Sequence, residues 1–267
     1  MNDLISLQQC ARNGEKLAML TCYDASFAAR MEAAGIDAIL VGDTLGMVVQ
    51  GQTSTLPVSL DEMAYHTSAV ARGARHTFLI ADLPFGSYQG SPAQALQSAA
   101  RLLAAGAHCV KLEGGAVMAE TVAFLVARGI PVCGHLGLLP QSVHALGGYK
   151  VQAKNQDAAQ QLHEDAQLLT QCGAGMLVLE AIPAPLAKEV TEHLPIPTIG
   201  IGAGAGCSGQ VLVLYDMLGI TLGKVPRFAH NFLRESADIE HALGAYIQAV
   251  KQGHFPTEAH SFMSAGI

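Results

Sequence analysis

Ionisable side chains stand at the ends of several short apolar runs in this sequence. Carboxylates gathered around a single amine can hold a hard metal cation, and a carboxylate or an imidazole next to them can move a proton. This combination is typical of acid–base chemistry on a small molecule bound to a metal. The residues in question are Asp24, Asp43, Asp82, Lys111 with Glu113, His135 and Glu180.

The elements that position these residues recur along the chain. Short β-branched runs alternate with Ala-rich stretches of helical periodicity, which begin at Asp or Ser and end at Gly. Eight such runs in 267 residues predict one α/β domain over residues 1–267, a (β/α)₈ TIM barrel. The runs cover residues 17–24, 38–43, 78–84, 108–114, 131–137, 176–181, 197–204 and 210–216.

In a closed barrel of parallel strands, the carboxyl ends of all strands face one mouth, so these side chains are expected to meet there. The alternative for a single acid is that it caps the next helix. Asp24 fits that alternative best because a helical pattern follows it at once. Asp43 and Asp82 fit it poorly, since loops containing Gly or Pro follow them and no helix is expected to begin there.

The crowding of Asp43, Asp82 and Glu113 predicts a metal ion. Like charges repel and burial makes each charge costlier, and Lys111 alone cannot neutralise three carboxylates. An all-oxygen ligand set without Cys or His ligand spacing suits Mg²⁺, which retains water and leaves positions for substrate oxygens.

Lys111 and Glu113 are two residues apart on a predicted strand and therefore project to the same face. If that face is inward, Lys111 can bind a substrate carboxylate while Glu113 orients a metal-bound water; the alternative is a structural ion pair. Glu180 ends an apolar strand and suits a general base, with a helix cap as its alternative. His135 lies between glycines at a predicted strand end, which predicts more exposure than a core histidine has. It can either position a neighbouring group through a hydrogen bond or transfer a proton.

Two connections, residues 44–61 and 138–157, are longer than a barrel needs, which is typical of functional loops. The glycine-rich residues 200–206 predict either a phosphate-binding turn or a tight, close-packed turn.

Composition narrows the range of partners and compartments. A net charge of −7 without a basic run argues against nucleic acid or an anionic membrane, so we expect a small molecule or another copy of the chain. Six cysteines without a CxxC pair indicate reduced thiols. The first residues lack the pattern of a signal peptide and no run is long enough to cross a membrane, so we expect a cytoplasmic protein.

A series of motifs, in order, strongly resembles the ketopantoate hydroxymethyltransferase family over nearly the whole chain. The resemblance implies a barrel of the phosphoenolpyruvate/pyruvate type, with Mg²⁺, that uses 5,10-methylenetetrahydrofolate to convert 3-methyl-2-oxobutanoate into ketopantoate through an enolate, for pantothenate and coenzyme A synthesis. It also implies a homo-oligomer, typically a decamer. The motifs are "TCYDASFA", "VGDTLGMVVQG", "TLPVSLDEMAYH", "ADLPFGSY", "VKLEGG", "PVCGHLGLLPQS", "GGYKVQ", "LVLEAIP", "IGIGAG" and "DMLG".

The same resemblance implies roles for individual residues. Asp43 and Asp82 match the metal ligands, with Glu113 as a nearby carboxylate of the metal site. Thr44 and Lys111 match contacts to the keto acid, Glu180 matches the proton acceptor, and His135 matches an active-site neighbour. These assignments are listed by motif: "VGDTLG" for Asp43 and Thr44, "ADLP" for Asp82, "KLEG" for Lys111 and Glu113, "CGHLG" for His135 and "LVLE" for Glu180.

Two positions depart from the family pattern. Thr44 stands where Ser is usual, which keeps the hydroxyl, so we expect activity to survive. Ser208 stands where Asp is usual before "GQ", which removes any argument from a carboxylate in that loop.

Two other functions remain open from the sequence. A carbon–carbon lyase or a phosphonate-forming mutase of the same barrel type would share the metal carboxylates and the enolate. A barrel that binds a small molecule without catalysis would share the metal site but would not exchange the substrate C3 proton.

Overall fold

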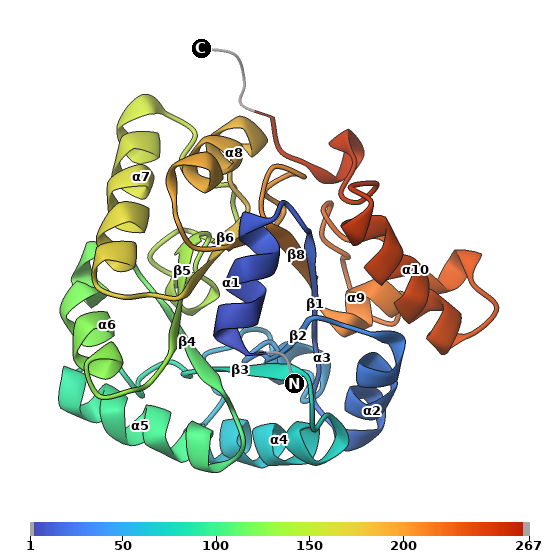
Figure 1. The fold of residues 1–267 in the computed structure, drawn as a ribbon, viewed down its shortest axis with the longest axis horizontal. Coiled ribbons are helices and arrows are strands. Elements are labelled where there is room, and N and C mark those ends of the chain that lie inside the picture. Colours follow the sequence, from blue (N-terminus) through green and yellow to red (C-terminus); the bar gives the residue numbers. More distant parts are fainter. Residues whose placement is uncertain (1–2, 264–267) are drawn as a thin grey trace.

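Eight parallel strands form a closed barrel in the order β1 to β8, each paired with its neighbours in the sequence and β1 paired with β8. The computed structural model describes residues 3–263. The barrel, with its ring of strands visible in Figure 1, confirms the predicted (β/α)₈ fold. The strands are β1 Leu17–Thr21, β2 Ala38–Val41, β3 Phe78–Asp82, β4 Cys109–Glu113, β5 Val132–Gly137, β6 Met176–Glu180, β7 Thr198–Ile201 and β8 Gly209–Leu212.

Helices surround the ring of strands on its outside (Figure 1). They begin where the sequence offers caps: the Asp24 carboxylate accepts hydrogen bonds from the N–H groups of Ser26 and Phe27, which confirms its role as the cap of α2. The α-helices are α1 Leu4–Arg12, α2 Ala25–Ala34, α3 Leu45–Val48, α4 Leu60–Gly73, α5 Pro92–Ala104, α6 Ala119–Val126, α7 Gln156–Gln171, α8 Ala184–His193, α9 Leu214–Leu218 and α10 Ile239–Lys251. The 3₁₀ turns are η1 Ala116–Met118, η2 Pro140–Ser142, η3 Leu233–Glu235 and η4 Glu258–His260.

Side chains of alternate strand residues fill the barrel interior, as the two-residue period of a strand requires. On β4, Cys109 belongs to the apolar cluster inside the barrel, so Lys111 and Glu113 also face inward. The helix α1 contributes Leu7 to that cluster at the amino-terminal end of the barrel. In Figure 1, α1 lies over the centre of the ring of strands. The barrel interior is therefore apolar near the amino-terminal ends of the strands and polar near their carboxyl ends.

The connection between β7 and β8 contains no helix, in contrast to the expected repeat. The chain returns through the glycine-rich residues 202–208, and Gly202, Gly204 and Gly206 pack directly against neighbouring side chains. A Cβ atom on Gly204, for example, would come within 2.4 Å of the Ala184 Cβ. These contacts support the close-packed turn over the phosphate-binding turn.

Several strands are shorter than the predicted runs, and two differences concern the residues after β8 and β2. The eighth strand was expected to reach residue 216, but residues 214–218 form α9. A one-turn helix, α3, begins directly after Thr44, where no helix was expected; no side chain caps it, so Asp43 remains available for another role. No helix among residues 3–263 is both long enough and apolar enough to cross a membrane.

Candidate active site

All seven residues predicted to form the site lie together at the carboxyl ends of the strands. They line one hollow of about 50 Å³ in the barrel mouth, which has room for a few water molecules. Strands β2 to β6 or the residues directly after them supply the seven, and Thr21, Val178 and Ile201 complete the walls. The seven are Asp43, Thr44, Asp82, Lys111, Glu113, His135 and Glu180.

The two aspartates are buried and touch one another. Asp43 and Asp82 are 2% and 3% exposed, and the Asp43 N–H donates to Asp82 Oδ2 at 3.1 Å. Burial, followed by repulsion from Asp82 and Glu113, raises the pKa of Asp43 well above its ordinary value, although Lys111 and Gln141 oppose the shift. The pair therefore carries charge at a high free-energy cost unless a cation shares the site.

Lys111 supplies the positive charge in the mouth. Its Nζ lies 2.7 Å from Asp82 Oδ1, and both side chains are almost fully buried. Burial lowers the pKa of Lys111, but the carboxylates of Asp82, Glu113 and Asp43 outweigh it and raise the pKa above its ordinary value. Lys111 is therefore an ammonium ion at neutral pH.

The His135 ring lies between two glutamates and is 2% exposed, so the expectation that it is too exposed for a buried histidine was wrong. Its Nε2 lies 3.1 Å from Glu180 Oε2 without the angle of a hydrogen bond, and its Nδ1 lies 3.6 Å from Glu113 Oε1. Burial and Lys111 lower the pKa of His135, but Glu113 and Glu180 outweigh them and raise it. Because the Lys111 ammonium, 3.3 Å from Nδ1, can only donate, the neutral ring carries its proton on Nε2, facing Glu180.

Thr44, which follows β2, and Glu180, at the end of β6, complete the mouth. The Thr44 hydroxyl lies 2.9 Å from the Tyr23 hydroxyl, which also donates to Thr21. The Glu180 side chain is 14% exposed, whereas the side chains of Asp82 and Glu113 are 4% and 3% exposed. A group that exchanges protons with a substrate needs this access.

The donor atoms of the mouth fit Mg²⁺. Asp82 Oδ1 already pairs with the Lys111 ammonium at 2.7 Å, and no other Lys or Arg lines the mouth, so no second side-chain cation among its lining residues serves Asp43 and Glu113. No three His, Cys, Asp or Glu side chains among residues 3–263 converge as a complete metal-binding group. Mg²⁺ does not require one, since it binds through one or two carboxylates and fills its other positions with water and substrate.

Two buried polar residues of the site were missed from the sequence. Gln141 and Tyr88 join the carboxylates of Asp43 and Glu113 through hydrogen bonds. Neither is charged near neutral pH, so a search for ionisable groups passes over them. The available signal was their place in "ADLPFGSY" and "GHLGLLPQS", which the family resemblance includes.

Ser208 lies outside the mouth. Its hydroxyl accepts from the Thr198 N–H at 3.2 Å, and its own N–H donates to Thr198 Oγ1 at 3.3 Å, at the amino-terminal ends of β7 and β8. The departure from the family pattern at this residue therefore affects strand pairing rather than the carboxylates.

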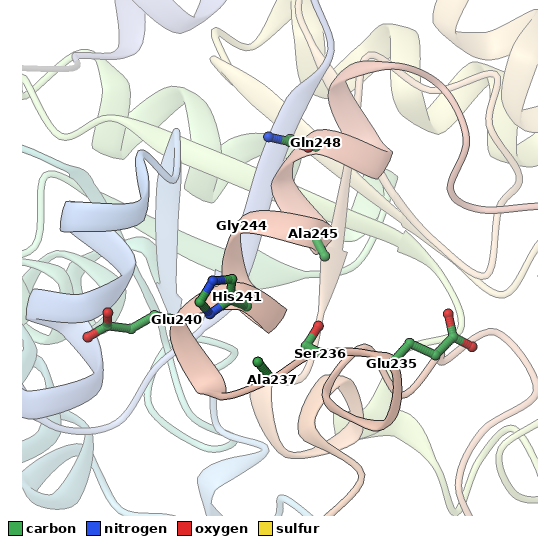
Figure 2. A pocket seen from close by; sticks show the side chains of 8 residues that line it. All are labelled: Glu235, Ser236, Ala237, Glu240, His241, Gly244, Ala245 and Gln248. Atoms are coloured by element: carbon green, nitrogen blue, oxygen red, sulfur yellow. The ribbon is translucent and has the colours of Figure 1, made fainter.

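A wider depression of about 560 Å³ lies on the outer face of α10 and the preceding turn (Figure 2). Its charged side chains already have structural partners: Glu240 pairs with Arg30, and His241 lies 2.8 Å from Asp238, the N-cap of α10. Nothing in this arrangement resembles the buried charge cluster of the mouth. The depression is lined by Glu235, Ser236, Ala237, Glu240, His241, Gly244, Ala245 and Gln248.

A closed (β/α)₈ barrel with buried ionisable groups at the carboxyl ends of its strands defines a barrel enzyme. The family model for ketopantoate hydroxymethyltransferase matches residues 2–258. The chain belongs to the ketopantoate hydroxymethyltransferase family.

Curated relatives extend over almost the full length of the chain. The 3-methyl-2-oxobutanoate hydroxymethyltransferase of Thiobacillus denitrificans (strain ATCC 25259 / T1) is 61% identical over 97% of this chain and 98% of its own. The protein of the same name from Nitrosomonas europaea is 59% identical over 97% of this chain and 96% of its own. 

Solved structures with low sequence identity share the fold. A phosphonopyruvate hydrolase in complex with oxalate and Mg²⁺ has a TM-score of 0.61 at 14% identity, covering 80% of this chain and 81% of its own. A 2,3-dimethylmalate lyase of the PEP mutase/isocitrate lyase superfamily has a TM-score of 0.58 at 18% identity, covering 82% and 83%. These likenesses support the closed (β/α)₈ fold.

Proposed function

We propose that the protein transfers a hydroxymethyl group from 5,10-methylenetetrahydrofolate to 3-methyl-2-oxobutanoate and produces 2-dehydropantoate (ketopantoate), within pantothenate and coenzyme A synthesis. Membership of the family and the names of the relatives support this reaction. The observation that carries it is the meeting of Asp43, Asp82, Lys111 and Glu180 in one mouth. These groups suit binding of an α-keto acid and removal of a proton from its C3 carbon.

Asp43 and Asp82 are the proposed ligands of Mg²⁺, and Glu113 acts on the metal through a water molecule. A bound Mg²⁺ would draw electron density from the 2-oxo group of the keto acid and acidify its C3 proton. Lys111 offers its ammonium to the substrate carboxylate, and Thr44 offers a hydroxyl beside Asp43. The buried walls exclude bulk water, which strengthens both contacts.

Glu180 is the proposed proton acceptor. Its carboxylate is the accessible one in the mouth, and the Nε2 side of the His135 ring faces it at 3.1 Å. Removal of the C3 proton leaves an enolate, whose C3 forms the new carbon–carbon bond to the methylene carbon while one of the two C–N bonds of that carbon breaks. A water molecule then replaces the second C–N bond and supplies the hydroxyl of the product, and tetrahydrofolate leaves with one proton from C3 and one from water.

Deuterium exchange at C3 of 3-methyl-2-oxobutanoate in D₂O tests the proton transfer without the folate. The wild type is expected to exchange only with Mg²⁺, and exchange is expected to fall by about 100-fold or more in Glu180→Gln, as for loss of a general base. Asp43→Asn is expected to lose the Mg²⁺ dependence together with the rate. Undiminished exchange in Glu180→Gln would remove that residue from the role of base.

The same preparation separates the alternatives. A carbon–carbon lyase or a phosphonate-forming mutase would act without folate, and the lyase would cleave a 2-hydroxy di- or tricarboxylate. A non-catalytic barrel would bind a ligand in the presence of Mg²⁺ but would not exchange the C3 proton. Product formation that requires methylenetetrahydrofolate supports the transferase against all three.

The whole chain is proposed to act as one catalytic barrel domain in a cytoplasmic homo-oligomer, a decamer, without nucleic-acid or membrane partners. The resemblance to the ketopantoate hydroxymethyltransferase family supports this assembly. Light scattering of the purified protein tests the decamer, and a monomer would contradict it.

A further inference from the structure

The side chain of Gln141 crosses the barrel mouth to the proposed metal ligand Asp43. Gln141 lies in η2, at the start of the long connection after β5, and is 5% exposed. Its Nε2 donates to Asp43 Oδ2 at 2.9 Å, although the two residues are 98 positions apart. One of the two long connections thus reaches back to an acid that follows β2.

The Gln141 amide can adopt only one orientation in this setting. Its Nε2 donates to Asp43 Oδ2 and to the Leu83 carbonyl oxygen, each at 2.9 Å. Its Oε1 accepts from the Tyr88 hydroxyl at 2.8 Å and from Gln89 Nε2 at 3.2 Å. Exchange of the amide nitrogen and oxygen would place lone pairs against lone pairs at Asp43 and Leu83, so the N–H is fixed on the carboxylate.

Tyr88 connects this amide to β4. Its hydroxyl is buried and accepts from the Glu113 N–H at 3.1 Å while it donates to Gln141 Oε1. The backbone N–H of Gln141 in turn donates to Glu113 Oε2 at 3.0 Å. Successive donors therefore run from the Glu113 backbone through Tyr88 and Gln141 to Asp43, and each bond polarises the next.

These contacts hold two carboxylates of the site at once. Gln141 binds Asp43 through its side chain and Glu113 through its backbone, so one residue sets the separation of the two acids. Residues that bond to metal-binding groups orient them, and their loss typically weakens metal affinity.

We propose that Gln141 is a positioning residue that sets the Asp43 carboxylate for a divalent cation, and that the Tyr88 hydroxyl fixes the Gln141 amide in the orientation that does so. The inference rests on the proposed function, because it takes Asp43 as a metal ligand. It gives the connection 138–157 a role in binding metal.

Titration of the full-length protein with Mg²⁺ by isothermal calorimetry, without substrates, tests the proposal. Gln141→Ala removes the amide and is expected to raise the Kd for Mg²⁺ about 10-fold or more. Tyr88→Phe removes only the hydroxyl and keeps the ring, and it is expected to raise the Kd about 3-fold. If Gln141→Ala does not fold, Tyr88→Phe alone decides the question.

Gln160→Ala is a matched control. It also removes an amide bonded to a carboxylate, since Gln160 Nε2 donates to Glu164 Oε1 at 2.8 Å, but on the exposed face of α7. It is expected to bind Mg²⁺ with the wild-type Kd. The thermal unfolding midpoint of each variant sets a titration temperature at which all are folded, so a change in Kd does not reflect loss of folded protein.

The outcomes separate this proposal from the proposed function. Wild-type Mg²⁺ affinity in both Gln141→Ala and Tyr88→Phe, with lost affinity in Asp43→Asn, overturns the positioning role and leaves Asp43 as a ligand. Wild-type affinity in Asp43→Asn overturns the metal assignment and the positioning role with it. Weakened binding in all three supports both.

Discussion

Removal of the charge on Lys111 is the sharpest test of the electrostatic balance in the mouth. Lys111→Met keeps the length of the side chain and removes the ammonium that lies 2.7 Å from Asp82 Oδ1, where the two side chains are 5% and 4% exposed. Breaking a buried ion pair leaves an uncompensated charge, so we expect a loss of about 3–5 kcal/mol in the free energy of unfolding at pH 7 without divalent cations. At about 2–4 °C per kcal/mol for a chain of this size, the unfolding midpoint falls by roughly 6–20 °C.

The loss is expected to depend on pH. The folded-state pKa of Asp43 is already raised by burial and by Asp82 and Glu113, and Lys111 is the charge that opposes the shift. Without Lys111 the folded state holds its protons to still higher pH, so stability falls as pH rises above the ordinary pKa of an aspartate, about 4. The difference between variant and wild type is therefore largest at pH values above the raised pKa of Asp43 in the wild type, and it shrinks as the pH falls below that pKa.

Urea denaturation at pH 7 and pH 5, with and without MgCl₂, measures these effects. Mg²⁺ replaces part of the missing charge, so it is expected to raise the midpoint of Lys111→Met by more than that of the wild type. Lys188→Met is the control, because the Lys188 side chain is 65% exposed and pairs with Glu192 at 3.8 Å. This variant is expected to change the free energy of unfolding by less than about 0.5 kcal/mol.

One result would refute the reasoning. If Lys111→Met unfolds at the wild-type midpoint at pH 7 in the absence of divalent cations, the three carboxylates do not depend on Lys111 for their stability, and the case for a crowded acidic site needing a cation fails with it.

Three further predictions concern other parts of the barrel. Glu32 accepts hydrogen bonds from His76 and Thr77, and although burial raises the pKa of Glu32, these bonds outweigh burial and lower it. In denaturant titrations at neutral pH, Glu32→Gln is therefore expected to lose about 1–2 kcal/mol in the free energy of unfolding. The difference from the wild type is expected to disappear as the pH falls through the lowered pKa of Glu32. Gly137 has a φ of +94°, and a Cβ there would lie 2.2 Å from the Glu180 carbonyl oxygen, so Gly137→Ala is expected to lose about 3 kcal/mol or more by the same assay. Burial raises the pKa of the Cys22 thiol to about 12. Iodoacetamide at pH 8 is therefore expected to leave the buried thiols unmodified until the protein unfolds, and mass spectrometry measures the modification. The buried thiols are Cys22, Cys109, Cys133 and Cys207.

Local sequence rules predicted the parts of the molecule in which neighbouring residues decide the outcome. The two-residue period placed Lys111 and Glu113 on one inward face, and the helical pattern after Asp24 marked it as a cap. The rule that parallel strands share one mouth then brought Asp43 and Glu180 together, although nothing in the sequence joins them directly.

Features set by packing between distant segments escaped the same rules. The glycines beside His135 suggested exposure, but the strands on either side and the two glutamates bury the ring. Apart from its place in a family motif, Gln141 gave no signal, because its role comes from contact with Asp43 across the barrel rather than from its neighbours in the chain. The missing helix between β7 and β8 depends on side chains from elsewhere packing against the glycine turn.

The position of α1 determines from which end small molecules reach the buried carboxylates. Leu7 of α1 packs into the apolar interior, and the mouth lies at the opposite end of the barrel. The barrel is therefore closed by α1 at its amino-terminal end and open at the carboxyl ends of its strands. Every molecule that reaches the buried carboxylates must therefore enter and leave at the carboxyl ends of the strands.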